Sequence, residues 1–369
     1  MKNTTWLLPS VLLSLLPALA LAQGPLTPPA GAPAPTMKSL DQIEARTPLV
    51  AGSPGVAINL GTITISEPGS YYLTGHHSAN LSHGIVIRAS DVTLDLNGFR
   101  IRSSALSVGG GGTGTGIRIE AEATQNVTIS NGSIVSSFTY NGTAFTGQGF
   151  SAGILTVGEG KKNVVVRDIT VSGVGGRGIS LETTSNAIVD SCAVNTVGGN
   201  GIMATVVRDC AVHNAGGEFG IWAWQIENSR GHSVGGSGIH GVERVAHSSG
   251  ETRHAAVGSH GIVSEGDVTH SYGRASVAGS GNGIRAQFGV VSNSSGRSNG
   301  GDGIYADTVV ASYGFAATGA LHGINATHIV HSRGRRQSAE AGKYGMSGTR
   351  AVGSYLSEGD NVTQKYDMP

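Results

Sequence analysis

The chain has 369 residues, of which 59 are glycine and 13% are charged, and its formal net charge at pH 7 is zero. A protein without an excess of Lys and Arg lacks the charge that nucleic acid requires, so we expect no nucleic-acid partner. The glycines follow no Gly-X-Y register, which excludes collagen and favours a fold rich in turns.

The first residues predict a signal peptide over residues 1–22. Lys2 precedes an apolar run from Trp6 to Leu21, and small residues end at Ala22, which is the order of segments in a cleavable export signal. The run contains two prolines and is short for a membrane span, and no later segment is long and apolar enough to cross a bilayer. We therefore expect a secreted, periplasmic or cell-surface protein that does not span a membrane.

Two short segments precede the predicted main domain. Residues 23–36 are rich in proline and predict an extended linker. Over residues 37–48, Ser39 and Gln42 have the spacing of a capping box and Pro48 supplies a stop signal, so a short N-terminal capping helix is predicted there. Such a helix would cover the apolar end of a solenoid, and an unstructured connector is the alternative.

A glycine followed by an aliphatic residue recurs through the rest of the chain. The spacing becomes roughly 18 to 25 residues, a period at which each unit must stack on its neighbours to bury its apolar face. We therefore predict a solenoid of about twelve coils over residues 49–369. The pairs are Gly84-Ile85, Gly116-Ile117, Gly153-Ile154, Gly178-Ile179, Gly201-Ile202, Gly220-Ile221, Gly238-Ile239, Gly261-Ile262, Gly283-Ile284, Gly303-Ile304, Gly323-Ile324 and Gly345-Met346.

Each predicted coil consists of short strands separated by turns. In the segment GIRI at 116–119, apolar and polar residues alternate, which places the isoleucines inside and Arg118 outside. A second strand, such as VTI at 127–129, ends at Asn131, a residue type that tolerates a left-handed backbone. Because equivalent corners stack, ladders of similar side chains are expected along the solenoid. Later corners are expected at Asp168, Asp190, Asp209, Asn228, His247, His270, Asn293 and His331.

The opening coils carry two longer motifs, GSYYLTG at 69–75 and DVTLDLNGF at 91–99. Together with the Gly-Ile strands and asparagine corners, they make the chain resemble the right-handed parallel β-helices of the pectin-lyase superfamily. The resemblance implies an all-β fold, a single-stranded right-handed parallel β-helix. It fixes no activity, since the same fold carries lyases, hydrolases, epimerases, phage tailspikes and adhesins. A left-handed β-helix is the alternative, but that fold expects an uninterrupted hexapeptide rhythm, which loops of varied length break here.

The resemblance also implies where a ligand would lie. In polysaccharide-active members of the superfamily, the substrate lies along the outer face of the first strand of each coil. Trp222 and Trp224 alternate with Ile221 and Ala223, so both indoles should point outward, where an aromatic face suits a sugar ring. A long loop or a second subunit that covers them is the alternative. The ligand-binding residues predicted on this face are Trp222, Trp224, His240, Glu265, Arg285 and Tyr305.

A comparison with polygalacturonases, which the resemblance suggests, supplies the catalytic candidates Asp302, Asp307 and His322. Asp302 and His322 immediately precede Gly-Ile pairs, and Asp307 should face outward on the same coil as Asp302. The chain departs from the family pattern, because Asn282 stands where an Asp is expected and Gly301 replaces one member of an Asp pair. Inverting hydrolysis needs two carboxyl groups, so this departure puts the activity in doubt. The alternative is that these positions are ordinary polar corners.

Two corner groups are candidates for cation binding. Asp168, Asp190 and Asp209 could line up on adjacent corners and bind Ca²⁺, although small offsets in register would spread their like charges instead. His247 and His270 also occupy adjacent corners, and a stacked solvent-exposed pair is expected there because no third metal ligand is nearby. We predict no resident metal or cofactor.

Other features concern the flanks and the interior of the solenoid. Arg274, Arg297 and Arg335 follow glycines at equivalent points, so they form either a basic stripe for an anionic polymer or an ordinary solvated flank. Cys192 and Cys210 are expected to stack and to be buried if the local sequence sets the register, with disulfide formation left open. If the distance to the next Gly-Ile pair sets the register, they fall one residue apart and face opposite ways.

Two inserts, the inward residues of the later coils and the C-terminal tail also carry structural signals. The inserts at 103–115 and 136–152 precede the outward face, and the aromatic residues of the second should pack onto the coil rather than over a ligand. Inward residues shrink from Ile87 and Ile119 to alanine in later coils, which predicts slimmer coils there. The polar tail after Tyr355 either folds over the last coil or leaves that end open to a second copy, as in a homo-oligomer.

Three functions are compatible with this sequence. The first is a secreted or surface protein that binds a polysaccharide along the outer face of its first sheet. The alternatives are a polysaccharide hydrolase or lyase that uses the same face, and a structural surface rod without a ligand.

Overall fold

The structure, a computed structural model, describes residues 46–79, 83–103, 114–120, 122, 124–256, 258–279, 281–317, 319–337, 344–354 and 361–366. Every regular element in these segments is a β-strand, and none of the described residues forms a helix able to cross a membrane. The predicted signal peptide, the linker and most of the capping helix lie outside the described residues.

The end of the predicted capping helix is a strand instead. Thr47–Pro48 forms β1, which pairs in parallel with β4 (Gly69–Tyr72). Pairing with the open edge of β4 satisfies backbone groups that a helix would satisfy within itself, and a proline is tolerated at such an edge. The helix prediction is therefore wrong for these residues.

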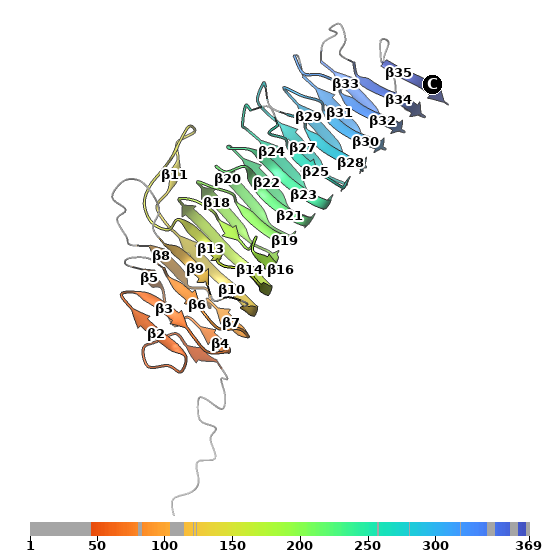
Figure 1. Cartoon of the computed structure of the whole chain (residues 1–369). Helices are drawn as coiled ribbons and strands as arrows, with labels where there is room; N and C mark the ends of the chain where they lie inside the picture. Colours follow the sequence, from red (N-terminus) through yellow and green to blue (C-terminus); the bar gives the residue numbers. More distant parts are fainter. Residues whose placement is uncertain are drawn as a thin grey trace, which may run out of the picture. The chain divides into compact units, whose positions relative to one another are not determined.

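The strands stack in three columns, and the coils from β3 to β33 each contribute to all three (Figure 1). The first column contains β3 (Thr62–Ile65), β6 (Ile85–Ile87), β9 (Thr115–Ile119), β13 (Ala152–Thr156), β15 (Ile179–Ser180), β19 (Ile202–Arg208), β21 (Phe219–Glu227), β23 (Ser237–Ala246), β25 (Ile262–Ser264), β28 (Ile284–Ser292), β30 (Ile304–Val310), β32 (Ile324–Val330) and β34 (Met346–Val352). The second column contains β1, β4, β7 (Val92–Asp95), β10 (Gln125–Val135), β14 (Lys161–Val174), β17 (Ile188–Asp190), β26 (Asp267–Thr269) and the later halves of the long first-column strands.

The third column follows a sharp corner at the end of the second. It contains β5 (His77–Ala79), β8 (Arg100–Ser103), the later halves of β10 and β14, β18 (Ala193–Val197), β20 (Ala211–Ala215), β22 (Arg230–Ser233), β24 (Ser249–Thr252), β27 (Tyr272–Ala275), β29 (Ser295–Ser298), β31 (Tyr313–Ala316) and β33 (Arg333–Arg336). Three short strands lie beside the columns. β2 (Val56–Asn59) pairs antiparallel with β3, β16 (Thr184–Ser185) pairs with the start of β14, and β35 (Asn361–Tyr366) adds to β34.

The Gly-aliphatic pairs form one column of rungs, as predicted. Ile63 and Ile85 are paired across β3 and β6, and the same register continues without a break to Ile324 and Met346. These aliphatic side chains are buried. The glycine before each is required by close packing, since a Cβ on Gly178 would lie 2.5 Å from the carbonyl oxygen of Gly201.

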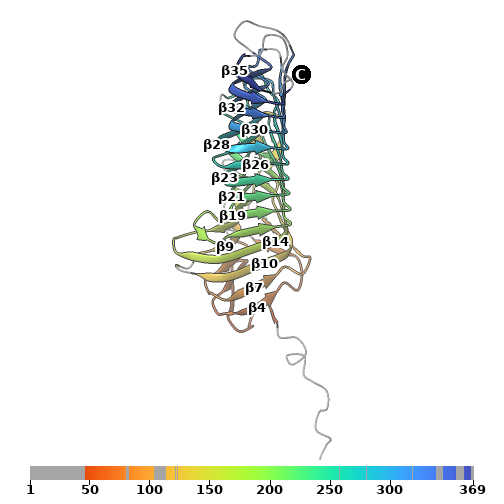
Figure 2. The ribbon, with the colours of Figure 1, turned by 90° about the vertical axis from the view of Figure 1, so that its right-hand side faces the viewer.

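The coils become narrower along the chain, which confirms the predicted slimming (Figure 2). The main cause is the inward residue of the third column, which changes from aliphatic to glycine. Where it is glycine, the third strand lies directly against the Gly-Ile strand of the next coil, and a Cβ on Gly273 would be 2.1 Å from the oxygen of Gly283. In register, this position holds Ile101, Ile134, Val171, Val194 and Val212, and then Gly231, Gly250, Gly273, Gly296, Gly314 and Gly334.

A ladder of small polar side chains follows the corner between the second and third columns. Each side chain accepts a hydrogen bond from the backbone N–H of its equivalent on the preceding coil, as Ser271 Oγ does from Ser248 at 3.1 Å. Cys192 and Cys210 are the first two members; both are buried free thiols, and the predicted stacking is confirmed. The ladder consists of Cys192, Cys210, Ser229, Ser248, Ser271, Ser294, Ser312, Ser332 and Ser354.

The second insert folds as a small hairpin, in which β11 (Thr139–Tyr140) pairs antiparallel with β12 (Phe145–Thr146). At its base, Phe138 and Phe150 are buried. These two phenylalanines therefore pack onto the coils, as predicted. Residues 104–113 of the first insert lie outside the described residues.

Candidate functional site

The outward residues of the first column form a single row along the coils, which we call the first-column face. Parallel pairing brings residues that are far apart in sequence into adjacent rungs, about 4.8 Å apart. The row consists of Arg118, Leu155, Ser180, Met203, Trp222, His240, Val263, Arg285, Tyr305, Asn325 and Ser347. The register therefore places the predicted ligand-binding residues Trp222, His240, Arg285 and Tyr305 in one line.

Both tryptophans of β21 point outward, as the alternation predicts. Ile221 and Ala223 are fully buried between them, Trp222 is half-buried, and Trp224 is 46% exposed. No described loop covers Trp224. The strand geometry thus presents two indoles on one surface. Trp224, the more exposed of the two, lies in the row beside the first-column face.

His240 lies one rung beyond Trp222 and packs edge-on against Phe219, with the ring centroids 4.9 Å apart. Burial lowers the pKa of His240, and the Glu265 carboxylate opposes this shift. Since burial dominates, the imidazole is neutral near pH 7 and can both donate and accept a hydrogen bond. Glu265 itself is exposed at the end of β25.

Arg285 and Tyr305 continue the row on the next coils. The Arg285 guanidinium lies 6.0 Å from the centre of the Tyr305 ring, and it donates a hydrogen bond to Gln287 at 3.1 Å. The Tyr305 ring is 38% exposed. From Trp222 to Tyr305 the row spans four rungs, or about 19 Å. The face therefore has aromatic groups at both ends and hydrogen-bonding and charged groups between them.

The residues just before the Gly-Ile strands form a second polar ladder, which we call the entry ladder. Asn282 donates its backbone N–H to His260 Nδ1 at 2.8 Å, Asp302 donates to Asn282 Oδ1 at 2.9 Å, and His322 donates to Asp302 Oδ1 at 2.8 Å. Tyr344 donates in the same way to His322 Nδ1 at 3.0 Å. Each accepting side chain thus stabilises the turn that precedes the Gly-aliphatic strand of the following coil. This is the role of an ordinary polar corner residue, the alternative to catalysis that was given for these positions.

The catalytic candidates are only partly brought together. Asp302 and His322 are adjacent in the entry ladder, and Asp302 is buried, which raises the pKa of its carboxyl group. Its second oxygen accepts a hydrogen bond from Asn325 at 3.3 Å, at the edge of the first-column face. Asp307 is five residues further along an extended strand, so the two α-carbons are about 16 Å apart. Inverting hydrolysis requires carboxyl groups about 6.5 to 9.5 Å apart.

The predicted row of corner aspartates does not form. Asp190 stands one residue before the left-handed corner, and in the strand register it is opposite Arg167 and Arg208. Asp168 is therefore in register with Ser191 rather than with Asp190. Asp190 forms an ion pair with Arg208 at 2.8 Å. The proposed arrangement for Ca²⁺ is therefore wrong, and among the described residues no group of three His, Cys, Asp or Glu could hold a metal ion.

Two other predicted alignments are confirmed. His247 and His270 stack with their ring centroids 5.0 Å apart. Arg274 and Arg297 are in register, and Phe315 separates them from Arg335 on the next rungs. The Arg297 guanidinium lies 4.9 Å from the Phe315 ring, so the phenylalanine supports the basic stripe through a cation–π contact.

Leu155 and Val263 also stand in the first-column row, although neither was among the predicted outward residues. The contact of Asn325 with Asp302, which joins the entry ladder to the face, was not predicted either. The repeated Ser-Tyr-Gly at 271–273 and 312–314 is a signal for further aligned aromatic residues at the start of the third column.

No family model matches the chain, and neither does any curated protein. Among solved structures, the chain is similar to the A-module of the mannuronan C-5 epimerase AlgE4 of Azotobacter vinelandii, with a TM-score of 0.50 and 13% identity over 81% of this chain and 89% of that one. At this identity the likeness shows the fold alone. The chain is a parallel β-helix.

Two other solved structures are similar to this β-helix. One is the A-module of the mannuronan C-5 epimerase AlgE6 of the same organism, with a TM-score of 0.43 and 15% identity over 82% of this chain and 91% of that one. The other is the enzymatically active domain of tailspike protein 2 of bacteriophage CBA120, with a TM-score of 0.30 and 16% identity over 83% of this chain and 46% of that one.

Proposed function

We propose that this β-helix binds a polysaccharide along the first-column face, with Trp222, Trp224, His240, Arg285 and Tyr305 as the contact residues and Glu265 at the flank. The observation that carries the proposal is the outward pair of indoles on β21. Trp222 is in line with an exposed tyrosine about 19 Å away, and Trp224, beside that row, is 46% exposed. Aromatic faces provide apolar area for the C–H face of a pyranose at low entropic cost.

Binding is favoured over cleavage by the placement of the carboxyl groups. Both carboxylate oxygens of Asp302 accept hydrogen bonds within the β-helix, one from His322 and one from Asn325. Asp307 lies too far along the strand to act as the second carboxyl group. The first-column face therefore has groups that hold a sugar chain, while the two carboxyl groups predicted to act in catalysis do not have the spacing that inverting hydrolysis requires. We further propose that the protein acts outside the cytoplasm, because residues 1–22 have the order of segments of an export signal.

Replacement of both tryptophans by alanine should weaken polysaccharide binding at least about tenfold, since buried aromatic contacts dominate most interfaces. The polymer is first identified by screening the purified protein against a panel of polysaccharides, and affinity is then measured by calorimetry. The double variant Trp222→Phe/Trp224→Phe is the control, because it keeps two aromatic faces and should retain most of the affinity. Unchanged binding by the alanine variant would show that the polysaccharide does not bind at the two tryptophans, and binding of no polysaccharide by the wild type would favour the structural-rod alternative.

A polysaccharide hydrolase or lyase is the second candidate function, and one observation favours it. Asp302 is a buried carboxyl group with a raised pKa that touches Asn325 on the first-column face, and such groups are frequent in active sites. In that case Asp302 would act as an acid or a base at the edge of the bound chain.

The variant Asp302→Asn separates the two candidate functions. Asn282 shows that asparagine fits the entry ladder, so the variant should fold and should bind polysaccharide as the wild type does. Release of reducing ends or unsaturated uronates from the identified polymer is then measured for both proteins. Product release by the wild type that is lost in the variant would replace binding by catalysis as the function of this face.

A further inference from the structure

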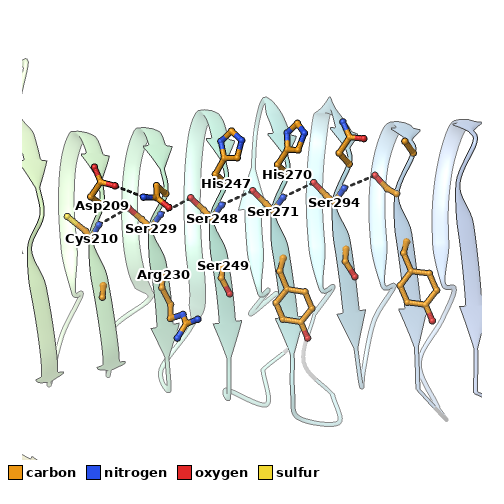
Figure 3. A pocket seen from close by; sticks show the side chains of 18 of the residues that line it. Asp209, Cys210, Ser229, Arg230, His247, Ser248, Ser249, His270, Ser271 and Ser294 are labelled. Carbon is orange, nitrogen blue, oxygen red and sulfur yellow. Dashed lines mark hydrogen bonds between the residues drawn. The ribbon is translucent and has the colours of Figure 1, made fainter.

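We propose a second ligand site, a groove along the corner between the second and third columns that binds a linear acidic polysaccharide. The groove has a volume of about 1200 Å³ and runs over consecutive coils from Asp209 to Arg333. Figure 3 shows it from close by, with the serine ladder between the corner side chains and the first side chains of the third column. It does not involve the first-column face, so it is independent of the function proposed above.

The floor of the groove is rigid and already hydrogen-bonded. Ser271 Oγ donates to the carbonyl oxygen of Thr269 at 2.8 Å and accepts from the backbone N–H of Ser248 at 3.1 Å, and Ser248 and Ser294 repeat this arrangement. Because each hydroxyl proton is committed to the β-helix, the floor offers no free donor. Recognition in this groove must therefore come from its two walls.

One wall carries two aromatic rings that are two rungs apart. Tyr272, Ser295 and Tyr313 are in register on β27, β29 and β31, so the two tyrosines are two rungs, or about 10 Å, apart. Tyr272 is 40% exposed, and the small serine between the rings leaves space beside each. An extended sugar chain presents equivalent ring faces at the length of a disaccharide unit, which matches this spacing and suits stacking on each tyrosine.

The same wall is basic near both ends of the groove. Arg230 lies two rungs before Tyr272, and Arg333 lies one rung after Tyr313. Both side chains are exposed, and neither forms an ion pair with a described residue. The acidic residue of the groove, Asp209, already accepts a hydrogen bond from Asn228. The positive balance selects a chain with carboxylates, to which each guanidinium can donate two hydrogen bonds.

The opposite wall supplies hydrogen-bonding side chains. His247 and His270 are stacked and exposed at adjacent corners, and Asn293 occupies the next one. The left-handed backbone at each of these corners holds the side chain at the rim. These groups can bind sugar hydroxyls from the side opposite the tyrosines, so an occupant would be held between the two walls.

Calorimetric titration of the purified protein with hexagalacturonate tests the proposal. We expect the variant Tyr272→Ala/Tyr313→Ala to lose one binding equivalent, or to weaken it at least about tenfold. The variant Trp222→Ala/Trp224→Ala should keep that equivalent, so failure of the first-column site and failure of the groove are distinguished. Arg230→Gln/Arg333→Gln should reduce the salt dependence of binding at the groove.

Three outcomes would overturn the assignment. The first is an absence of hexagalacturonate binding by the wild type, and the second is unchanged stoichiometry and affinity in the tyrosine variant. The third is equally tight binding of hexaglutamate with the same dependence on the tyrosines, which would show that the groove recognises acidic peptides. Ser295→Glu gives an independent check, because it introduces a carboxylate between Tyr272 and Tyr313 without removing a large side chain, and it should weaken binding of the acidic chain.

Discussion

Replacement of Gly273 by alanine should lower the free energy of unfolding by about 3 kcal/mol, at the upper end of the usual cost of overpacking. A Cβ at this position would lie 2.1 Å from the carbonyl oxygen of Gly283 and 2.6 Å from a methylene of Ile284. The oxygen cannot move freely, because it accepts a hydrogen bond from Ile262 at 3.0 Å. The coil would therefore have to widen against its neighbours, and urea unfolding followed by circular dichroism measures the loss.

Gly75→Ala is the matched control for this prediction. No heavy atom lies within 4 Å of a Cβ at Gly75, so the change in unfolding free energy should stay within about 0.5 kcal/mol. Gly250→Ala should behave like Gly273→Ala, since its Cβ would meet the oxygen of Gly261 at 2.1 Å. Equal stability of the Gly273 and Gly75 variants would show that the glycine column does not set the width of the later coils.

Acidification should destabilise the protein through His260. Burial lowers the pKa of His260 from 6.5 to about 4, and the nearby Arg285 and His240 add to the shift. The unfolded chain therefore binds a proton in this range while the folded chain does not. The stabilising contribution is fully present above pH 6.5 and is lost as the pH falls toward 4. The loss amounts to about 2.5 kcal/mol at about pH 4.5.

The variant His260→Asn isolates this contribution. The His260 Nδ1 accepts the Asn282 N–H at 2.8 Å, and Asn282 performs the same task on the next coil with its side-chain oxygen. The variant should match the wild type near neutral pH and exceed its stability by about 2.5 kcal/mol at about pH 4.5. His247→Asn, at an exposed corner, is the control. Parallel stability profiles of the wild type and His260→Asn between these pH values would contradict the prediction.

Some residues of the candidate site could be placed from the sequence because their position depends on the Gly-aliphatic pair alone. Trp222, His240, Arg285 and Tyr305 each follow such a pair by one residue, and all four lie in one row. Trp224 points outward for the same reason, since strand alternation carries it past the buried Ala223. Local spacing is enough here, because the paired aliphatic side chains fix both the register and the facing of the strand.

Other residues were misplaced because their position depends on the length of a neighbouring strand. Asp190 looks like a corner residue in the sequence, yet Ser191 takes the left-handed conformation and Asp190 pairs with Arg208. Asp302 and Asp307 are close in sequence, but an extended backbone holds their α-carbons about 16 Å apart. A shift of one residue in the register moves a side chain to the opposite face of the strand, and residue type alone does not reveal such a shift.

The recurring glycine and aliphatic residue are enough to specify a stack of parallel coils, because each repeat can bury its apolar face only against the next repeat. The roles of the polar turn residues, in contrast, follow only from how the coils stack. Asp302 and His322 became members of a hydrogen-bonded ladder because backbone N–H groups of the following coil lie within reach. Tyr272 and Tyr313 came to share one groove wall because two rungs of a sheet bring together side chains from separate repeats.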